Sequence, residues 1–345
     1  MGLPEIFIAF ETAGLSAISR SARGVLAVAV ADETVDRPMQ IYRSAAEIRR
    51  EEYTAENYRL LCLAFLSSPS KVIVVRCSAQ DADTFSRLDQ LQFNWLAAPG
   101  LESAQVLSYI RQRRALGRGI KAVLANADGP DCEGIVNFCA QDLVLDDGAI
   151  SPEAYAVRIA ALLCALPLTR SATYVALPEV VSCAAADDPD AQVEAGKLIL
   201  VPGGDGYRLG RAVNSLTTLT PDKGAVFQKI KILEGIDLIC TDISSTFENS
   251  YIGQVLNDYD NKLLLVTAIN GYFAALEGDV LDKTASNRCA VSLEGQRTYL
   301  EAHGITTDGM KDGEILRANT GSEVFLEATL TFCDAMEDLS LHIAM

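Results

Sequence analysis

"RGVLAVAVA", residues 23 to 31, is a run of mostly apolar side chains that predicts a buried β-strand. A second apolar run, "KVIVVRC" (71–77), predicts another buried strand. Between them, "TAENYRLLCLAFL" (54–66) has its apolar residues at helical spacing behind Thr54, which can cap the helix. A strand, a helix and a strand in this order indicate an α/β unit with a right-handed crossover.

Strand and helix patterns continue along the rest of the chain. Ser151 as N-cap and Pro152 at the first helical position predict the start of a helix. The further helices are expected at 102–116, 151–166, about 226–248, about 259–277 and 292–303. The further β segments are expected at 120–126, as short strands around 146–148, as two strands around a Gly-rich turn within 197–213, and at 314–321, 323–332 and 339–345.

A stretch of small, polar and acidic residues, "SCAAADDPDAQVEAG" (182–196), interrupts these patterns. It predicts a loop or short helix that joins two parts of the fold. The sequence therefore predicts the α/β (α+β) class, with mixed sheets and flanking helices in two parts.

Both ends of the chain also have the alternating apolar pattern that predicts a strand. Ile6, Ile8 and Phe10 recur at every second position of "LPEIFIAF", and the last residues, "LSLHIAM", place Leu339, Leu341, Ile343 and Met345 on one face. A lone strand leaves its backbone donors and acceptors without partners in any sheet. Something must therefore pair with both ends.

Bulk composition excludes several classes of function. The 345 residues carry a formal charge of −17 with no basic block, which argues against nucleic-acid binding. The apolar segments are too short or too interrupted for a membrane span, and no secretory signal is expected at the start. The nine cysteines form no CxxC pair and are interpreted as reduced thiols of a cytosolic protein.

Candidate chemical sites are few. "GGDGYRLG" (203–210) lacks the spacing of a phosphate-binding loop, so a hairpin turn is favoured there. His303 precedes Gly304 at an expected helix end, where it can meet the last carbonyls, and His342 is expected to be exposed. Asp258 or Asp260 is interpreted as a helix cap. No catalytic, cofactor or metal site is predicted.

Two blocks of the sequence resemble a known family. They are "LPLTRSATYVALPEV" (166–180) and the segment 210–281, which contains "GRAVNSLTT" and "YIGQVLNDYDNK". Both are similar to the contractile tail sheath proteins of myovirus-type phages and phage-tail-like bacteriocins, and the two chain ends look like the ends of that family. Residues 32–150 are less distinctive, and the chain looks shorter than relatives that carry an additional β-rich domain there.

The resemblance implies a structural role rather than an enzymatic one. Sheath subunits form stacked hexameric rings in a helical tube around an inner tail tube protein, with baseplate and tail terminator proteins as further partners. The sheath shortens to drive the tube through a target envelope without nucleotide hydrolysis by the subunit. The protein would be assembled in the cytoplasm of the producing bacterium and then reside in a phage tail or a released tail-like particle.

The resemblance also implies a division of the chain and a role for its ends. The expected parts are an N-terminal arm (1–22), an outer α/β domain (23–196), a C-terminal sheath core (197–333) and a C-terminal arm (334–345). The arms would add strands to sheets of neighbouring subunits, with Ile6, Ile8, Phe10, Leu339, Leu341 and Ile343 as the intersubunit residues.

Two alternatives remain open from the sequence. One keeps the family and makes the chain the sheath of a secretion-system or extracellular injection machine. The other is a cytosolic α/β enzyme that binds a phosphorylated ligand at 203–210.

Overall fold

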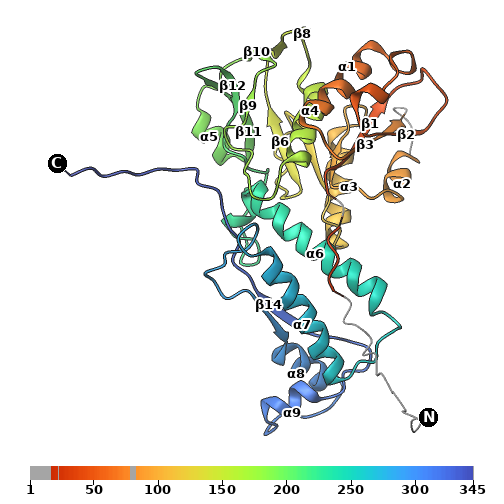
Figure 1. The fold of residues 1–345 in the computed structure, drawn as a ribbon, viewed down its shortest axis with the longest axis vertical. Coiled ribbons are helices and arrows are strands. Elements are labelled where there is room, and N and C mark those ends of the chain that lie inside the picture. Colours follow the sequence, from red (N-terminus) through yellow and green to blue (C-terminus); the bar gives the residue numbers. More distant parts are fainter. Residues whose placement is uncertain (1–16, 22, 78–82, 345) are drawn as a thin grey trace, which may run out of the picture. The chain divides into compact units, whose positions relative to one another are not determined.

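The computed structural model describes residues 17–21, 23–77 and 83–344, and the chain forms two compact units (Figure 1). The large unit comprises residues 21–241 together with 334–345. The small unit comprises residues 242–333 together with the described residues 17–20.

The large unit is built on a nine-stranded mixed sheet with the strand order β2-β3-β1-β4-β5-β6-β11-β12-β9. The strands are β1 (Val25–Ala31), β2 (Met39–Tyr42), β3 (Lys71–Cys77), β4 (Trp95–Ala97), β5 (Lys121–Ala125), β6 (Ile135–Cys139), β9 (Ala176–Leu177), β11 (Lys197–Gly203) and β12 (Gly206–Leu209). The six strands from β3 to β11 run parallel, and β2, β12 and β9 add antiparallel pairings at the two sides.

Helices cover both faces of the parallel part of this sheet. They are α1 (Ala55–Ala64), α2 (Asp83–Asp89), α3 (Ser103–Ala115), α4 (Pro152–Ala165) and the short α5 (Pro189–Glu194). Leu26, Val28 and Val30 of β1 share a core with α1 and α4, whereas Val25 and Ala27 share a second core with α2 and α3. Burial on both faces explains why β1 is apolar at successive positions.

Short elements complete the large unit. A three-stranded sheet has the order β10-β7-β8 and contains β7 (Val144–Leu145), β8 (Gly148–Ala149) and β10 (Val180–Ser182). The 3₁₀ turns are η1 (Ala45–Glu47), η2 (Arg50–Glu52), η3 (Phe65–Ser67) and η4 (Ala225–Gln228). The predicted caps of α1 and α4 are confirmed, since Thr54 accepts from Asn57 N–H and Ser151 from Ala154 N–H, both at 3.2 Å.

The small unit is mainly helical. Helix α6 (Ile230–Ser250) begins in the large unit and continues into the small unit after residue 241. The small unit also contains α7 (Tyr259–Leu276), α8 (Leu293–Ala302), α9 (Asp312–Arg317) and a two-stranded antiparallel sheet of β13 (Arg288–Val291) and β14 (Leu326–Thr329). Inside this unit the Tyr272 hydroxyl of α7 donates to Asp242 of α6 at 2.6 Å.

Most predicted elements are confirmed, but two β segments differ: residues 339–344 form no strand within this chain, and the prediction for 314–321 is wrong. Residues 314–321, expected to be β structure, begin inside α9. The Glu314 carboxylate accepts a hydrogen bond from the backbone N–H of Lys311 at 2.9 Å, which closes the first helical turn, and Ile315 is fully buried. One buried apolar side chain per turn suits a helix better than an alternating strand.

The structure also adds elements that the sequence did not predict. Strands β2, β4 and β6 occupy short apolar runs, and β6 pairs with β11 in parallel register. A division of the chain at 196–197 would separate these two paired strands. None of the helices in the described ranges combines the length and hydropathy that a membrane crossing requires.

Candidate assembly surfaces

The C-terminal segment leaves the folded part of the chain as an extended run. Residues 335–344 belong to no strand, and the alternating side chains Leu339, Leu341 and Ile343 are 90%, 72% and 72% exposed. Three large apolar side chains in water on one alternating face are costly for a single chain. The matching N-terminal residues Ile6, Ile8 and Phe10 lie outside the described residues.

The first part of this segment, residues 334–338, is bound to the large unit and is called the arm root below. Asp334 pairs with Lys229, and Asp338 pairs with Arg211. The Glu337 carboxylate lies within hydrogen-bond distance of the hydroxyls of Thr173 and Ser171, at 2.6 and 2.8 Å. The exposed fraction of the side chain rises from 10% at Glu337 to 78% at Asp338. Met336 is already fully exposed, Glu337 is the last shielded side chain, and every described residue from Asp338 onward is exposed.

The two-stranded sheet of β13 and β14, called the small sheet below, has a side-chain partner along the β13 edge. The backbone N–H of Cys289 in β13 donates to the Asn270 side-chain oxygen at 2.8 Å, and the Asn270 amide donates to the Cys289 carbonyl at 3.0 Å. A single side chain of α7 thus satisfies the outward-facing backbone groups of Cys289, as a neighbouring strand would.

The other edge of the small sheet, along β14, is open among the described residues. Cys289 lies opposite Ala328, and Val291 opposite Leu326. Because Cys289 directs its backbone groups away from β14, alternation directs those of Ala328 and Leu326 away from β13. Ala328 is exposed, so its outward N–H and C=O are accessible to another strand.

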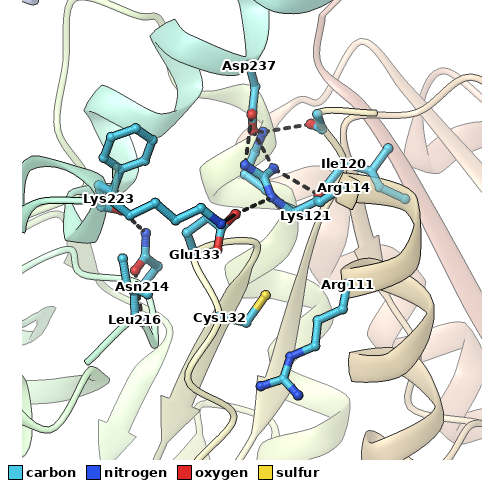
Figure 2. Close-up of polar contacts among 12 residues, drawn as sticks. Arg111, Arg114, Ile120, Lys121, Cys132, Glu133, Asn214, Leu216, Lys223 and Asp237 are labelled. Atoms are coloured by element: carbon cyan, nitrogen blue, oxygen red, sulfur yellow. Dashed lines mark hydrogen bonds and ion pairs between the residues drawn. The ribbon is translucent and has the colours of Figure 1, made fainter. Parts of the chain in front are cut away.

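A buried charged network fixes the first half of α6 within the large unit (Figure 2). Asp237 accepts hydrogen bonds from Lys121 at 2.7 Å and from both terminal nitrogens of Arg114 at 2.9 and 3.1 Å. Arg114 also reaches Glu133, which Lys223 approaches to 2.7 Å. The network therefore joins α6 to α3 and to the sheet at β5.

The second acidic residue of this helix face, Glu234, lies one turn before Asp237. It accepts a hydrogen bond from Trp95 Nε1 at 2.8 Å and pairs with Lys121 at 3.1 Å and with Arg23. Close approach is required here, because a Cβ placed on Gly119 would lie 2.8 Å from the Cβ of Asp237. The sequence reasoning missed this network, although Lys121 at the head of an apolar strand was a possible signal.

Burial raises the pKa of the Asp237 carboxyl, but the charges of Lys121 and Arg114 and their hydrogen bonds outweigh it and hold the pKa below its usual range. The pKa of Glu133 is lowered in the same way, against its burial, by Lys223 and Arg114. Both carboxyls are therefore ionised at neutral pH.

The other residues singled out in the sequence have structural roles. Residues 203–210 lie in the hairpin of β11 and β12, in which Gly204 and Asp205 connect Gly203 to Gly206, as predicted. His303 contacts the Tyr299 carbonyl at the end of α8, and Asp258 caps α7 through Asn261 N–H, both as predicted. His342 is exposed. Within the described residues, no group of three or more His, Cys, Asp and Glu side chains is arranged to hold a metal ion.

Solved structures that share this fold include sheath proteins. The helical sheath of the anti-feeding prophage in its contracted state matches with a TM-score of 0.73 at 12% identity, over 100% of this chain and 99% of that chain. The sheath tail protein from Desulfitobacterium hafniense matches with a TM-score of 0.67 at 15% identity, over 83% of this chain and 93% of that chain. The fold is that of a contractile sheath subunit.

The sequence comparison identifies the family. No family model matches the chain. The tail sheath protein of Clostridium phage phiCD119 is 34% identical over 366 residues, which cover 100% of this chain and 99% of the phage protein. The chain belongs to the tail sheath protein family, which confirms the resemblance seen in its sequence.

Proposed function

We propose that this chain, as a structural subunit of a contractile tail sheath, polymerises as stacked six-subunit rings around an inner tail tube and shortens to drive that tube through a target envelope. The family membership supports the structural role. The observation that carries the proposal is the C-terminal segment, in which Leu339, Leu341 and Ile343 extend into solvent from an anchored root.

The exposed segment acts as an arm that is donated to another copy. Strand addition satisfies the backbone groups of the arm while every second side chain packs on the acceptor. The open edge of β14 in a neighbouring subunit offers unpaired donors and acceptors for this purpose. Residues 1–22 form the second arm, with Ile6, Ile8 and Phe10 in the same role.

The free energy gained by burying the arm side chains is similar to the entropy cost of ordering the arm, which explains why these contacts function in an array. Burying three large apolar side chains yields about 1.5 to 3 kcal/mol each. Ordering the backbone of a seven-residue arm costs about 1 to 2 kcal/mol per residue. A single arm is therefore marginal, whereas many arms closing on one lattice make later contacts effectively intramolecular. The free energy of shortening then comes from subunit contacts, with no nucleotide hydrolysed by the subunit.

Deleting the arms tests the proposal. We expect removal of residues 1–11, or of 338–345, to leave a soluble folded monomer that forms no tubes, because the strand donor is lost. Negative-stain electron microscopy and sedimentation of the purified proteins measure the outcome, with circular dichroism as the check on folding. Normal tubes from either deletion would overturn the assigned role of that arm.

The remaining partners follow from the same role. We propose the inner tail tube protein, the baseplate and a tail terminator as contacts, with assembly in the producing bacterium's cytoplasm before the sheath joins a phage tail or a released particle. The phage relative favours a phage tail over a secretion-system or extracellular injection machine. Neighbouring genes test this choice, because capsid and packaging genes accompany a phage tail.

A further inference from the structure

The arm root is seated in a site built from two distant segments of the large unit. Ser171 and Thr173 come from the connection between α4 and β9, whereas Arg211 follows β12 directly. The two segments are tied together, because the Thr173 hydroxyl accepts a hydrogen bond from the backbone N–H of Ala212 at 3.0 Å. They belong to the blocks "LPLTRSATYVALPEV" and "GRAVNSLTT", to which the proposed function assigned no role.

The local backbone holds these groups in place. Tyr174 has a positive φ of 57°, and its N–H donates to the Leu209 carbonyl at 3.1 Å. Tyr174 keeps this unfavourable left-handed conformation next to Thr173, whose hydroxyl donates to Glu337. The pKa of Asp334 is raised by burial, but the hydrogen bond from Lys229 and further contacts bring the pKa below its usual value. The Asp334 carboxylate is therefore ionised at neutral pH.

We propose that Ser171, Thr173, Arg211 and Lys229 form a carboxylate socket that clamps Glu337 and its acidic neighbours and thereby aims the C-terminal arm at another copy of this chain. The inference rests on the proposed function of the arm. The socket orders residues 334–338 in the free monomer, before assembly. The entropy cost of ordering these residues therefore does not oppose polymerisation.

The socket also sets the reach of the arm. With the root clamped at Asp338, seven residues remain, and they span at most about 25 Å when fully extended. The acceptor edge of the neighbouring copy must therefore lie within that distance of the socket. Without the clamp, twelve residues from 334 onwards would sample a larger volume, which lowers the effective concentration of the arm at its acceptor.

The experiment changes the socket and leaves the arm sequence unaltered. The socket variant carries Ser171→Ala, Arg211→Gln and Lys229→Gln, and the matched control carries Arg170→Gln, at an exposed arginine beside the socket. Carboxypeptidase digestion of the unassembled monomer, followed by mass spectrometry, reports how far the C-terminus can be trimmed. Trimming is expected to stop near Asp338 in the wild type and the control, and near Asp334 in the socket variant.

Assembly is measured in parallel as the lowest protein concentration that gives sedimenting tubes. We expect the socket variant to need about tenfold more protein than the control, equivalent to about 1.4 kcal/mol per added subunit. An unchanged stopping point would overturn the clamp, and an altered stopping point with unchanged assembly would overturn its aiming role. Normal tubes from the 338–345 deletion would instead refute the proposed function of the arm, and the digestion result would still decide the clamp.

Discussion

At the scale of single residues, the large unit depends on the buried ion pairs that Asp237 of α6 makes. Asp237 balances Lys121 and Arg114, all three largely shielded from water. Removing one member of such a group leaves an uncompensated buried charge, which costs more than the pair itself contributes.

Replacing Asp237 with asparagine tests this balance. We expect Asp237→Asn to lower the free energy of unfolding of the large unit by about 3 kcal/mol, because Lys121 and Arg114 lose their shared carboxylate and keep only Glu234 and Glu133 as partners. Urea unfolding followed by the fluorescence of Trp95, the single tryptophan, measures the loss. Asp205→Asn in the exposed hairpin turn is the control, and equal stability of the two variants would contradict the prediction.

The same variant has a defined pH dependence. Because the pKa of Asp237 is lower in the folded protein than in the unfolded chain, its stabilising effect is fully present above the unfolded value of about 3.9. That effect is lost as the pH falls through the lower, folded value. The stability difference between wild type and Asp237→Asn should therefore be constant near neutrality and shrink only in acid below about pH 4.

At the scale of elements, the two edges of the two-stranded sheet differ in their hydrogen bonding, and we infer that this difference selects the edge that accepts a strand. Asn270 occupies the backbone groups of Cys289 in β13, which leaves β14 as the open edge of this sheet among the described residues. One blocked edge and one open edge specify a single side for strand addition and suppress uncontrolled pairing on the other.

A proline at the open edge tests the acceptor. Ala328→Pro removes one of the two outward N–H groups of β14 but leaves the hydrogen bonds that Glu327 and Thr329 make with β13. We expect a folded protein that forms no tubes, as judged by circular dichroism and negative-stain microscopy. Ala328→Val keeps the N–H and should assemble normally. Tubes formed by the proline variant would show that the arm pairs elsewhere.

At the scale of the whole molecule, the two compact units are expected to differ in stability. Trp95 lies in the large unit, so tryptophan fluorescence reports the unfolding of that unit alone, whereas circular dichroism also reports the helices of the small unit. Two units with separate cores need not unfold in one step.

We therefore expect the fluorescence and circular dichroism transitions in urea not to coincide. Asp237→Asn should shift the fluorescence transition, whereas Asn270→Ala should destabilise only the small unit, since it leaves the Cys289 backbone groups unsatisfied at a cost of about 1 to 3 kcal/mol. Coincident transitions that both variants shift equally would show that the chain unfolds as one cooperative body.

The sequence by itself determined the local features of this protein. The apolar runs at 23–31 and 71–77 predicted β1 and β3, and Thr54, Ser151 and Asp258 predicted helix starts, because periodicity and capping depend on residues close in the chain. The alternation at Leu339, Leu341 and Ile343 likewise indicated a strand before any partner was visible.

Only the tertiary structure decided where the exposed C-terminal run leaves the large unit and which edge of the two-stranded sheet is open. Ser171 and Glu337 are separated by 166 residues, and Asn270 and Cys289 meet because α7 packs on β13. Hydrogen bonds between such distant residues leave no periodic signal in either segment. The socket and the open edge of β14 therefore emerge only once the chain is folded.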